Sequence, residues 1–402
     1  MINLEVPKKF ASLIGLAHQA AAEVFRPISR KYDLAEHSYP RELDMFAAMV
    51  EGMQASGEGS GAGATGVRRT AGERKDSGVR NGTNLSSVLS IMEMCWGDVG
   101  LLLSMPRQGL GNSAIASVGT DEQLERFAGK WAAMAITEPG CGSDSAAVTT
   151  TARRDGDHYV LNGEKIFVTA GERADAVVVW ATLDRSKGRA AIKPFVVEKD
   201  TPGFTVVGCE HKLGIRASDT ATLHLADCRV PKENLLGSPD IEGGFTGVMQ
   251  TFDNTRPLVA AMAVGVARAA LETTRELLAE AGVEVDYGRP GNAQHAAAAT
   301  YLAMEADWEA AYLLTLRAAW MADNAQPNSL QASMAKAKAG RTAVDVTLRC
   351  VELAGSVGYG EGELLEKWAR DSKILDIFEG TQQIQQLIIA RRLLNKTSAE
   401  LK

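Results

Sequence analysis

Residues 371–384 read Asp371-Ser-Lys-Ile-Leu-Asp-Ile-Phe-Glu-Gly-Thr-Gln-Gln-Ile384, and this stretch places one carboxylate, Glu379, among apolar neighbours. A carboxylate that loses its water holds its proton more tightly, so its pKa rises and it becomes a better base near neutral pH. The following Gly380 frees the backbone for close approach to a ligand. On this stretch alone, a Glu at the start of a helix, stabilised by the helix dipole, remains the simpler interpretation.

Two polar segments upstream have similar potential. Thr137-Glu-Pro-Gly-Cys-Gly-Ser-Asp144 follows a short apolar run, and such a turn offers N–H groups and hydroxyls to an anion or a carbonyl-rich ring. Phe167-Val-Thr-Ala-Gly171 puts an aromatic ring beside a hydroxyl at a predicted strand end, where it could flank a flat cofactor. A well-capped turn and a core Phe are the alternatives.

Hydrophobic spacing predicts helices on both sides of a β region. Phe10 to Ala20 has helical periodicity, and Ser86 to Met105 is typical of a second, more buried helix. From Gly243 onward the pattern is helical again, with Ala-rich surfaces that allow close packing in a bundle. The shared helical faces are Leu313, Leu316 and Trp320, and Val344, Leu348 and Val351.

The middle of the chain, from about Met134 to Gly237, has a sequence pattern typical of β-strands. Its β-branched and aromatic runs include His158 to Gly163 and Ala176 to Trp180. Asp155-Gly156 and Asn162-Gly163 predict hairpin turns.

Composition excludes several other classes. The chain has 402 residues, 43 Lys+Arg against 50 Asp+Glu, and a net charge of −7, so no nucleic-acid partner is expected. There is no apolar run of membrane-spanning length and no secretory pattern, and we expect a cytoplasmic protein. Five scattered cysteines and six dispersed histidines argue against disulfides and against a metal site.

Residues 52–82 are rich in Gly, Ser, Thr and Arg, and predict a flexible loop or lid. Gly61 to Gly66 nearly matches a P-loop, but Val67-Arg68 follows instead of Lys and a hydroxyl residue. No strand-like run precedes it, so a dinucleotide fold is not supported. Neither HExxH nor GxSxG occurs, which disfavours metalloprotease and hydrolase chemistry.

Taken in order, the three polar segments resemble the acyl-CoA dehydrogenase family, and the resemblance covers almost the whole chain except the N-terminal quarter, where it is weak. Further matching stretches are Leu213-Gly-Ile-Arg-Ala-Ser-Asp-Thr220, Val230-Pro-Lys-Glu-Asn-Leu-Leu-Gly237 and Asp253-Asn-Thr-Arg-Pro257. The resemblance implies an α+β fold with an N-terminal helical domain (1–130), a central β-barrel-like domain (131–237) and a C-terminal four-helix bundle (238–402).

The resemblance also implies an activity. The family uses FAD to oxidise an acyl-CoA thioester to the trans-2-enoyl-CoA, with a carboxylate taking the α-proton while the β-hydride passes to flavin N5. By resemblance Glu379 is that base, and its N–H helps to bind the thioester carbonyl. Some relatives carry the base on the helix of Asp253, where this chain has Thr255.

The same resemblance assigns the binding residues. The FAD-binding residues would be Ile136, Thr137, Gly142, Ser143, Phe167 (in place of a frequent Trp), Thr169, Thr381 and Gln383. The residues that bind acyl-CoA would be Ser143, Asp253, Arg256 and Gly380. Electron-transfer flavoprotein is the implied re-oxidant.

Two positions depart from the family pattern. Homotetrameric relatives hold the ADP half of a neighbour's FAD with an Arg and a Gln, where this chain has Glu284 and Glu352. Carboxylates beside a pyrophosphate would repel it. This motivates an α2β2 assembly with an unlike subunit, as in relatives that act on steroid side chains, as an alternative to a homotetramer. A shift of the alignment in this loop, or a Glu352 that points to solvent, would remove the conflict.

Two other functions remain open. A flavin-dependent monooxygenase or nitroalkane-oxidase-like enzyme usually lacks the Glu of this motif, so Glu379 disfavours it. A non-catalytic partner subunit is disfavoured by Glu379 and the turn at 137–144, and mildly favoured by Glu284 and Glu352.

Overall fold

The computed structural model describes residues 6–55, 82–107, 109–240, 246–397 and 400, with the backbone alone described at 49–55 and 246–254. Most of the predicted Gly-rich loop at 52–82 lies outside these residues. Its first residues, however, belong to helix α3 (Glu42–Ala55), so the prediction of a loop is wrong there.

The N-terminal part is helical, and its long central helix is interrupted. The helices are α1 (Ala11–Ala20), α2 (Arg26–Leu34), α3, α4 (Thr83–Gly97), α5 (Val99–Leu103), α6 (Leu110–Val118) and α7 (Asp121–Arg126). The single helix predicted from Ser86 to Met105 is wrong, because Asp98 is extended (φ −167°). Its carboxylate accepts a hydrogen bond from the Leu101 N–H at 2.7 Å and caps α5 as a separate helix.

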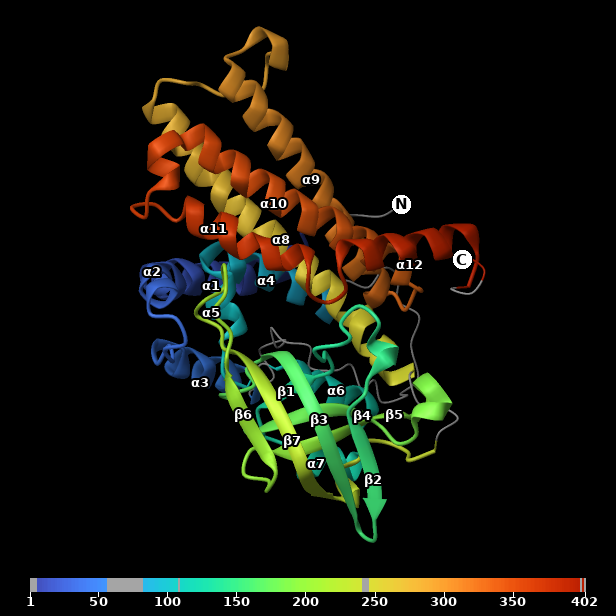
Figure 1. The fold of residues 1–402 in the computed structure, drawn as a ribbon. Helices are drawn as coiled ribbons and strands as arrows, with labels where there is room; N and C mark the ends of the chain where they lie inside the picture. The colour runs from blue at the N-terminus through green and yellow to red at the C-terminus, as the bar shows by residue number, and fades with distance from the viewer. Residues whose placement is uncertain (1–5, 56–81, 108, 241–245, 398–399, 401–402) are drawn as a thin grey trace.

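The middle of the chain forms one seven-stranded mixed sheet (Figure 1). Its strands are β1 (Ala132–Ala135), β2 (Thr151–Asp155), β3 (His158–Thr169), β4 (Ala176–Thr182), β5 (Ile192–Glu198), β6 (Phe204–Cys209) and β7 (Thr220–Pro231). Strand β4 is buried along its whole length, with antiparallel β5 on one edge and β1 and β2, both parallel, sharing the other. Strands β3, β7 and β6 continue from β2 as antiparallel neighbours.

One predicted hairpin turn is confirmed and the other is wrong. Gly156 has φ 62° and joins β2 to β3 after Asp155. Asn162-Gly163 instead lies inside β3, at a bulge opposite β7. Gly is needed there because a Cβ would lie 2.4 Å from the Thr150 hydroxyl.

The C-terminal part is a bundle of long helices that stands above the sheet in Figure 1. It comprises α8 (Thr246–Glu280), α9 (Ala296–Asp323), α10 (Ser329–Tyr359), α11 (Leu365–Ser372) and α12 (Gln382–Leu394). The Ala-rich surface of α10 does allow close packing: Ala335 and Ala339 are buried, and a Cβ on Gly340 would lie 2.7 Å from the Leu375 carbonyl oxygen. The segment before Glu379 therefore lies directly against α10.

The N-terminal helices and the bundle share one hydrophobic core, which includes Phe25, Ile91, Val264 and Trp368. The sheet has a core of its own, which includes Leu161, Val179 and Phe195. The predicted arrangement of helices, sheet and bundle is confirmed. The domain boundaries after residues 130 and 237 stay predictions.

The loop before β7 ties the three parts together. The Ile215 N–H donates to Asp371 of α11 at 2.5 Å, and the Ser104 hydroxyl, just after α5, donates to the Ala217 carbonyl at 2.9 Å. Beneath it, Lys367 is fully buried between Asp98 (2.7 Å) and Asp371 (2.5 Å). These bonds fix α11, which leads into the Glu379 segment, relative to α5 and to the loop before β7. Within the described residues, no helix has the length and apolarity needed to cross a membrane.

Candidate active site

Glu379 lies in the short connection between α11 and α12. In Figure 1 this connection is on the side of the bundle that faces the sheet. Its backbone is left-handed (φ 55°), as is that of Gly380 (φ 92°). Its carboxylate accepts a hydrogen bond from the hydroxyl of Thr255, on α8, at 2.6 Å. Helix α8 and the connection before α12, which are far apart in sequence, thus meet at this carboxylate.

Burial raises the pKa of Glu379, as the sequence predicts. The Thr255 hydrogen bond and the positive charges of Arg256 and Lys336 act in the opposite direction. Part of the Glu379 residue is exposed to solvent. Protein atoms nevertheless surround its carboxylate, and this loss of water is the largest influence on its pKa. The carboxylate can therefore reach a ligand and is more basic than an ordinary Glu.

The main-chain carbonyls of Glu379 and Gly380 accept hydrogen bonds from two buried side chains, Gln385 and Lys336. The side-chain amide of Gln385 donates to both carbonyl oxygens, at 3.0 and 3.1 Å. The buried ammonium of Lys336, on α10, donates to the Gly380 carbonyl at 2.8 Å. A Cβ on Gly380 would lie 2.6 Å from the Gln385 amide nitrogen, so this position needs Gly for its space as well as for its φ.

The turn at 137–144 is built on a buried ion pair. Glu138 is 3% exposed and Lys165, on β3, is 0% exposed; their charged atoms lie 2.7 Å apart. Glu138 also accepts hydrogen bonds from the N–H groups of Thr149 (2.7 Å) and Thr150 (2.9 Å). Burial by itself raises the pKa of Glu138, but Lys165 and these hydrogen bonds lower it to about 2. The carboxylate stays ionised and holds the turn from inside.

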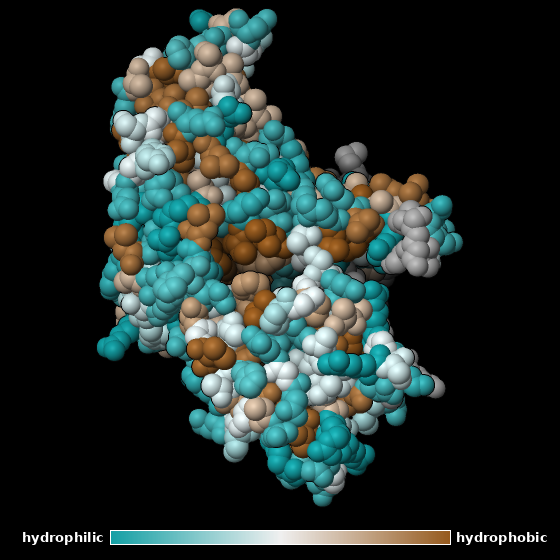
Figure 2. Space-filling model, in the orientation of Figure 1, coloured by the Kyte–Doolittle hydropathy of each residue, from teal (hydrophilic) through white to brown (hydrophobic). Residues whose placement is uncertain are grey.

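This turn and the end of β3 form one unit. The Ile166 N–H donates to the Thr137 carbonyl at 2.9 Å, so the first two predicted segments do come together. The next residue, Phe167, is left-handed (φ 57°) and 60% exposed, at a shift in the register of β3 against β7. Strained backbone of this kind clusters at active sites and ligand clamps, which makes Phe167 a candidate for ligand contact. Figure 2 shows hydrophobic side chains at the surface where the sheet meets the helical part.

The predicted site residues fall into two groups. Ile136, Thr137 and Thr169 are half-buried, whereas Gly142, Ser143 and Phe167 are exposed; all six lie on the turn after β1 or on β3. The second group lies on the bundle: Glu379, Gly380, Thr381, Gln383 and Arg256. Thr381 caps α12 by accepting from the Ile384 N–H at 3.4 Å, Gln383 is exposed, and Arg256 is buried on α8. Asp253 lies on α8, but its side chain is outside the described part.

Sequence reasoning does not find four contributors: the ion pair of Glu138 and Lys165, and the clamp of Lys336 and Gln385 on the Glu379 turn. In the sequence, Thr255 indicates only that a second base is absent, whereas in the structure its hydroxyl contacts Glu379. One available signal is the position of Lys336 on a helix face otherwise made of Ala332, Ala335, Ala339 and Ala343, all buried.

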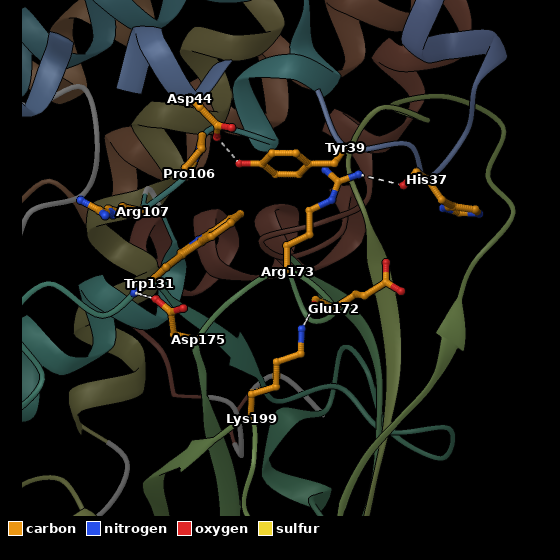
Figure 3. A pocket seen from close by; sticks show the side chains of 10 residues that line it. All are labelled: His37, Tyr39, Asp44, Pro106, Arg107, Trp131, Glu172, Arg173, Asp175 and Lys199. Carbon is orange, nitrogen blue, oxygen red and sulfur yellow. Dashed lines mark hydrogen bonds between the residues drawn. The ribbon is translucent and has the colours of Figure 1, made fainter. Parts of the chain in front are cut away.

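A separate pocket, of about 500 Å³, lies near the start of β1 (Figure 3). Its lining residues are His37, Tyr39, Asp44, Pro106, Arg107, Trp131, Glu172, Arg173, Asp175 and Lys199, and none of them is a predicted site residue. Arg173 donates to the His37 and Ser38 carbonyls at 3.2 and 3.1 Å, and Asp175 accepts from the Trp131 N–H at 2.8 Å. These bonds join loops to one another, which is a structural role for Arg173 and Asp175.

Two of the six histidines, though distant in sequence, come together. Potential ligand atoms of Glu36, His37 and His211 lie within 4.8 Å of one another. Glu36 already accepts a hydrogen bond from the Lys212 N–H at 2.9 Å, and its carboxylate pairs with His211 at 3.0 Å. The charge of Arg216 acts on the same carboxylate, which disfavours a cation there.

The two glutamates that depart from the family pattern are exposed. Glu352 lies 2.9 Å from Arg349, one turn earlier on α10, and Glu284 lies just after α8. Within this single chain, both carboxylates face solvent.

The chain is similar to known proteins in both sequence and fold. Residues 133–228 match the acyl-CoA dehydrogenase middle domain, and residues 242–394 match the acyl-CoA dehydrogenase C-terminal domain. A short-chain specific acyl-CoA dehydrogenase of Clostridium acetobutylicum is 37% identical over 328 residues, 79% of this chain and 85% of that protein. CarC, a subunit of the caffeyl-CoA reductase–Etf complex of Acetobacterium woodii, is 35% identical over 330 residues, 80% of this chain and 86% of that protein. The butyryl-CoA dehydrogenase structure of Megasphaera elsdenii has 30% identity and a TM-score of 0.82, covering 98% of this chain and 100% of that one.

The fold and the site define a flavin-dependent oxidoreductase, and the chain belongs to the acyl-CoA dehydrogenase family. Its activity is the FAD-dependent dehydrogenation of an acyl-CoA. The residues fit FAD: the exposed ring of Phe167 offers a face for the flavin, and the exposed Gly142-Ser143 turn offers a hydroxyl and N–H groups.

Proposed function

We propose that Glu379 is the base of this reaction and removes the α-proton of the acyl-CoA thioester. The observation that carries the proposal is its position: a desolvated carboxylate with a raised pKa, in a strained turn, contacted by Thr255 of a second helix. The α C–H bond of a thioester is weakly acidic, so a strong, water-poor base is required. Bound FAD supplies the acceptor for the hydride that leaves the β-carbon.

The turn itself supports the second requirement, stabilisation of charge on the thioester oxygen. The carbonyl oxygens of Glu379 and Gly380 already accept hydrogen bonds from Gln385 and Lys336 inside the protein. The Glu379 N–H is then available as a hydrogen-bond donor to the thioester carbonyl, where it would lower the cost of enolate formation.

The remaining predicted residues divide between cofactor and substrate. For FAD we propose Ile136, Thr137, Gly142, Ser143, Phe167, Thr169, Thr381 and Gln383. For acyl-CoA we propose Ser143, Asp253, Arg256 and Gly380. The buried positive charge of Arg256, near Glu379, supports the assignment of the α8 positions.

Replacement of Glu379 by Gln tests the base directly. We expect Glu379→Gln to bind FAD normally, since the amide has nearly the same shape, and to slow flavin bleaching by butyryl-CoA under anaerobic conditions by about 10³-fold. Bleaching at the wild-type rate would refute the role of Glu379. The Acetobacterium relative is named as a reductase, so oxidation of the reduced enzyme by crotonyl-CoA is measured as well.

For the substrate and partners, we propose a short-chain acyl-CoA and electron-transfer flavoprotein. The names of the Clostridium and Acetobacterium relatives support these choices. A panel of acyl-CoAs from short to long chains would show a maximum at the short end, and turnover would require the electron-transfer flavoprotein instead of dioxygen.

A tetramer in the cytoplasm is part of the same proposal, either as a homotetramer or as α2β2. The exposure of Glu284 and Glu352 leaves both carboxylates able to face a neighbouring subunit. The test is the FAD content of the purified chain and its mass in solution. One FAD per chain in a homotetramer would refute the α2β2 form.

A further inference from the structure

The turn at Glu379 contains two consecutive left-handed residues, of which only the second is Gly. A left-handed conformation is unfavourable for a residue with a side chain, so the surrounding structure must hold Glu379 in it. In this turn the donors that hold it are Lys336 and Gln385, which approach the two carbonyl oxygens between 2.8 and 3.1 Å.

The two donors differ in kind. Gln385 is neutral and fully buried, and its amide orientation is fixed because the opposite orientation would place its oxygen against two carbonyl oxygens. Lys336 is equally buried but carries a charge. Among the described residues it has no carboxylate within ion-pair distance, so its charge acts on its surroundings from inside the protein.

The groups around this charge come from three elements. Burial lowers the pKa of Lys336 to about 8, while Asp376 and Glu379 raise it and Arg256 lowers it. Asp376 is itself 3.4 Å from Lys373 and 3.9 Å from Arg341. Glu379 is contacted by Thr255, and both Arg256 and Lys336 stabilise its ionised form. Near neutral pH, Lys336 is protonated and lowers the proton affinity of the base.

We propose that Lys336 is a positioning residue for Glu379: its ammonium and the Gln385 amide clamp the turn that presents the carboxylate, and its buried charge also sets the basicity of that carboxylate. The inference rests on the proposed function, because it requires Glu379 to be the base. Lys336 does not touch the substrate in this arrangement and acts through Glu379 and Gly380.

The test separates the charge from the hydrogen bond. The readout is the pH dependence of anaerobic flavin reduction by butyryl-CoA in the FAD-loaded full-length chain. Lys336→Met removes both charge and donor, and Lys336→Gln removes the charge but keeps a donor. In both variants the acidic limb of the profile is expected to move to higher pH by about one unit, because the carboxylate loses a stabilising cation.

Three further variants complete the design. Gln385→Met removes two hydrogen bonds without changing charge, so it is expected to lower the rate about tenfold with an unshifted acidic limb. Lys336→Arg keeps the charge and is expected to leave the limb in place. Lys338→Met makes the same charge change two residues away, where the ammonium pairs with Asp307 at 2.5 Å, and is expected to behave as wild type.

An unshifted acidic limb in Lys336→Gln or Lys336→Met would overturn the proposal, as would an equal shift in Gln385→Met or Lys338→Met. If one of the two charge-removing variants does not fold, the other decides the question. Failure of the proposed function looks different, because Glu379→Gln would then retain fast flavin reduction whatever the behaviour of Lys336.

Discussion

Lys165 and Lys336 are both fully buried, and each supports a turn of the proposed site, but their charges are balanced differently. Lys165 contacts Glu138 at 2.7 Å, under the turn that we assign to FAD. Lys336 contacts the Gly380 carbonyl at 2.8 Å, under the turn that presents Glu379. In the ion pair of Lys165 and Glu138 the two charges neutralise each other, and the pair holds the conformation of the turn. Among the described residues, no carboxylate lies within ion-pair distance of Lys336, so its charge acts on the nearby carboxylate of Glu379. The neutral pair can hold a ligand-binding turn in place without an electric field, whereas the unpaired charge of Lys336 can change the pKa of Glu379.

Replacement of Glu138 by Leu should have the largest effect on stability. It would leave Lys165 charged and unpaired in the sheet interior, and such losses cost about 3–5 kcal/mol. We therefore expect Glu138→Leu to lower the free energy of unfolding by about that amount in urea titrations. The double variant Glu138→Leu/Lys165→Met, which removes both charges, should recover most of the loss. A double variant as unstable as the single one would show that the pair matters for more than charge balance.

The pH dependence of stability should report the unbalanced charge of Lys336. Burial lowers its pKa to about 8 in the folded protein, against an ordinary value of 10.5. Below pH 8 both folded and unfolded chains are protonated, and the burial cost is complete. Above pH 8 the folded protein releases the proton while the unfolded chain keeps it, so this cost falls as pH rises.

Wild type should therefore gain about 2 kcal/mol of stability relative to Lys336→Met between pH 8 and pH 10. The measurement is urea unfolding of both proteins at matched pH values, since subtraction removes the titration of other groups. Lys338→Met, at the protein surface, should show no such change against wild type. A constant difference across the range would mean that Lys336 keeps its proton in the folded protein.

Replacement of Gly380 by Ala tests whether the turn that Lys336 supports needs the space and the left-handed backbone of a Gly. A Cβ would meet the Gln385 amide nitrogen at 2.6 Å, and the φ of 92° disfavours any side chain. We expect a loss of about 1–3 kcal/mol in stability and a much slower flavin reduction. At Gly140, in the turn over the Glu138 pair, an added Cβ would have no atom within 4 Å and φ is not positive, so Gly140→Ala should be as stable as wild type.

The order of helices, sheet and bundle could be predicted because hydrophobic periodicity and β-branched runs report burial directly. The strand from Ala176, for example, is buried at every position. The site turns could be predicted only as unusual polar stretches. The sequence around Glu379 indicates a carboxylate among apolar residues, and burial does raise its pKa.

The supporting charges could not be predicted, for physical reasons that differ between the two turns. Lys165 lies on the same face of β3 as the buried Tyr159 and Leu161, a face that alternation reserves for apolar side chains. Its partner Glu138 lies in a turn 27 residues earlier, and a pairing over that separation is not visible in the pattern. Lys336 contacts Gly380 only because α10 passes under a turn more than forty residues later in the chain. The break at Asp98, between α4 and α5, is not visible in the sequence either. The apolar residues on both sides of Asp98 continue one helical periodicity, so the pattern predicts a single helix.

Phe167 offers the smallest and most selective test of the turn on the Lys165 side. It lies two residues after Lys165 but is 60% exposed and left-handed, so its ring contributes little burial and its backbone carries strain. Phe167→Gly should relieve that strain and change the stability of the FAD-free protein by less than about 1 kcal/mol.

If the ring packs on the flavin, the same variant should bind FAD about tenfold more weakly in a fluorescence titration. Phe167→Trp keeps an aromatic face and should retain wild-type affinity. Equal FAD affinity in wild type and Phe167→Gly would place the flavin elsewhere and would leave the Glu138–Lys165 pair as support for a turn without a cofactor role.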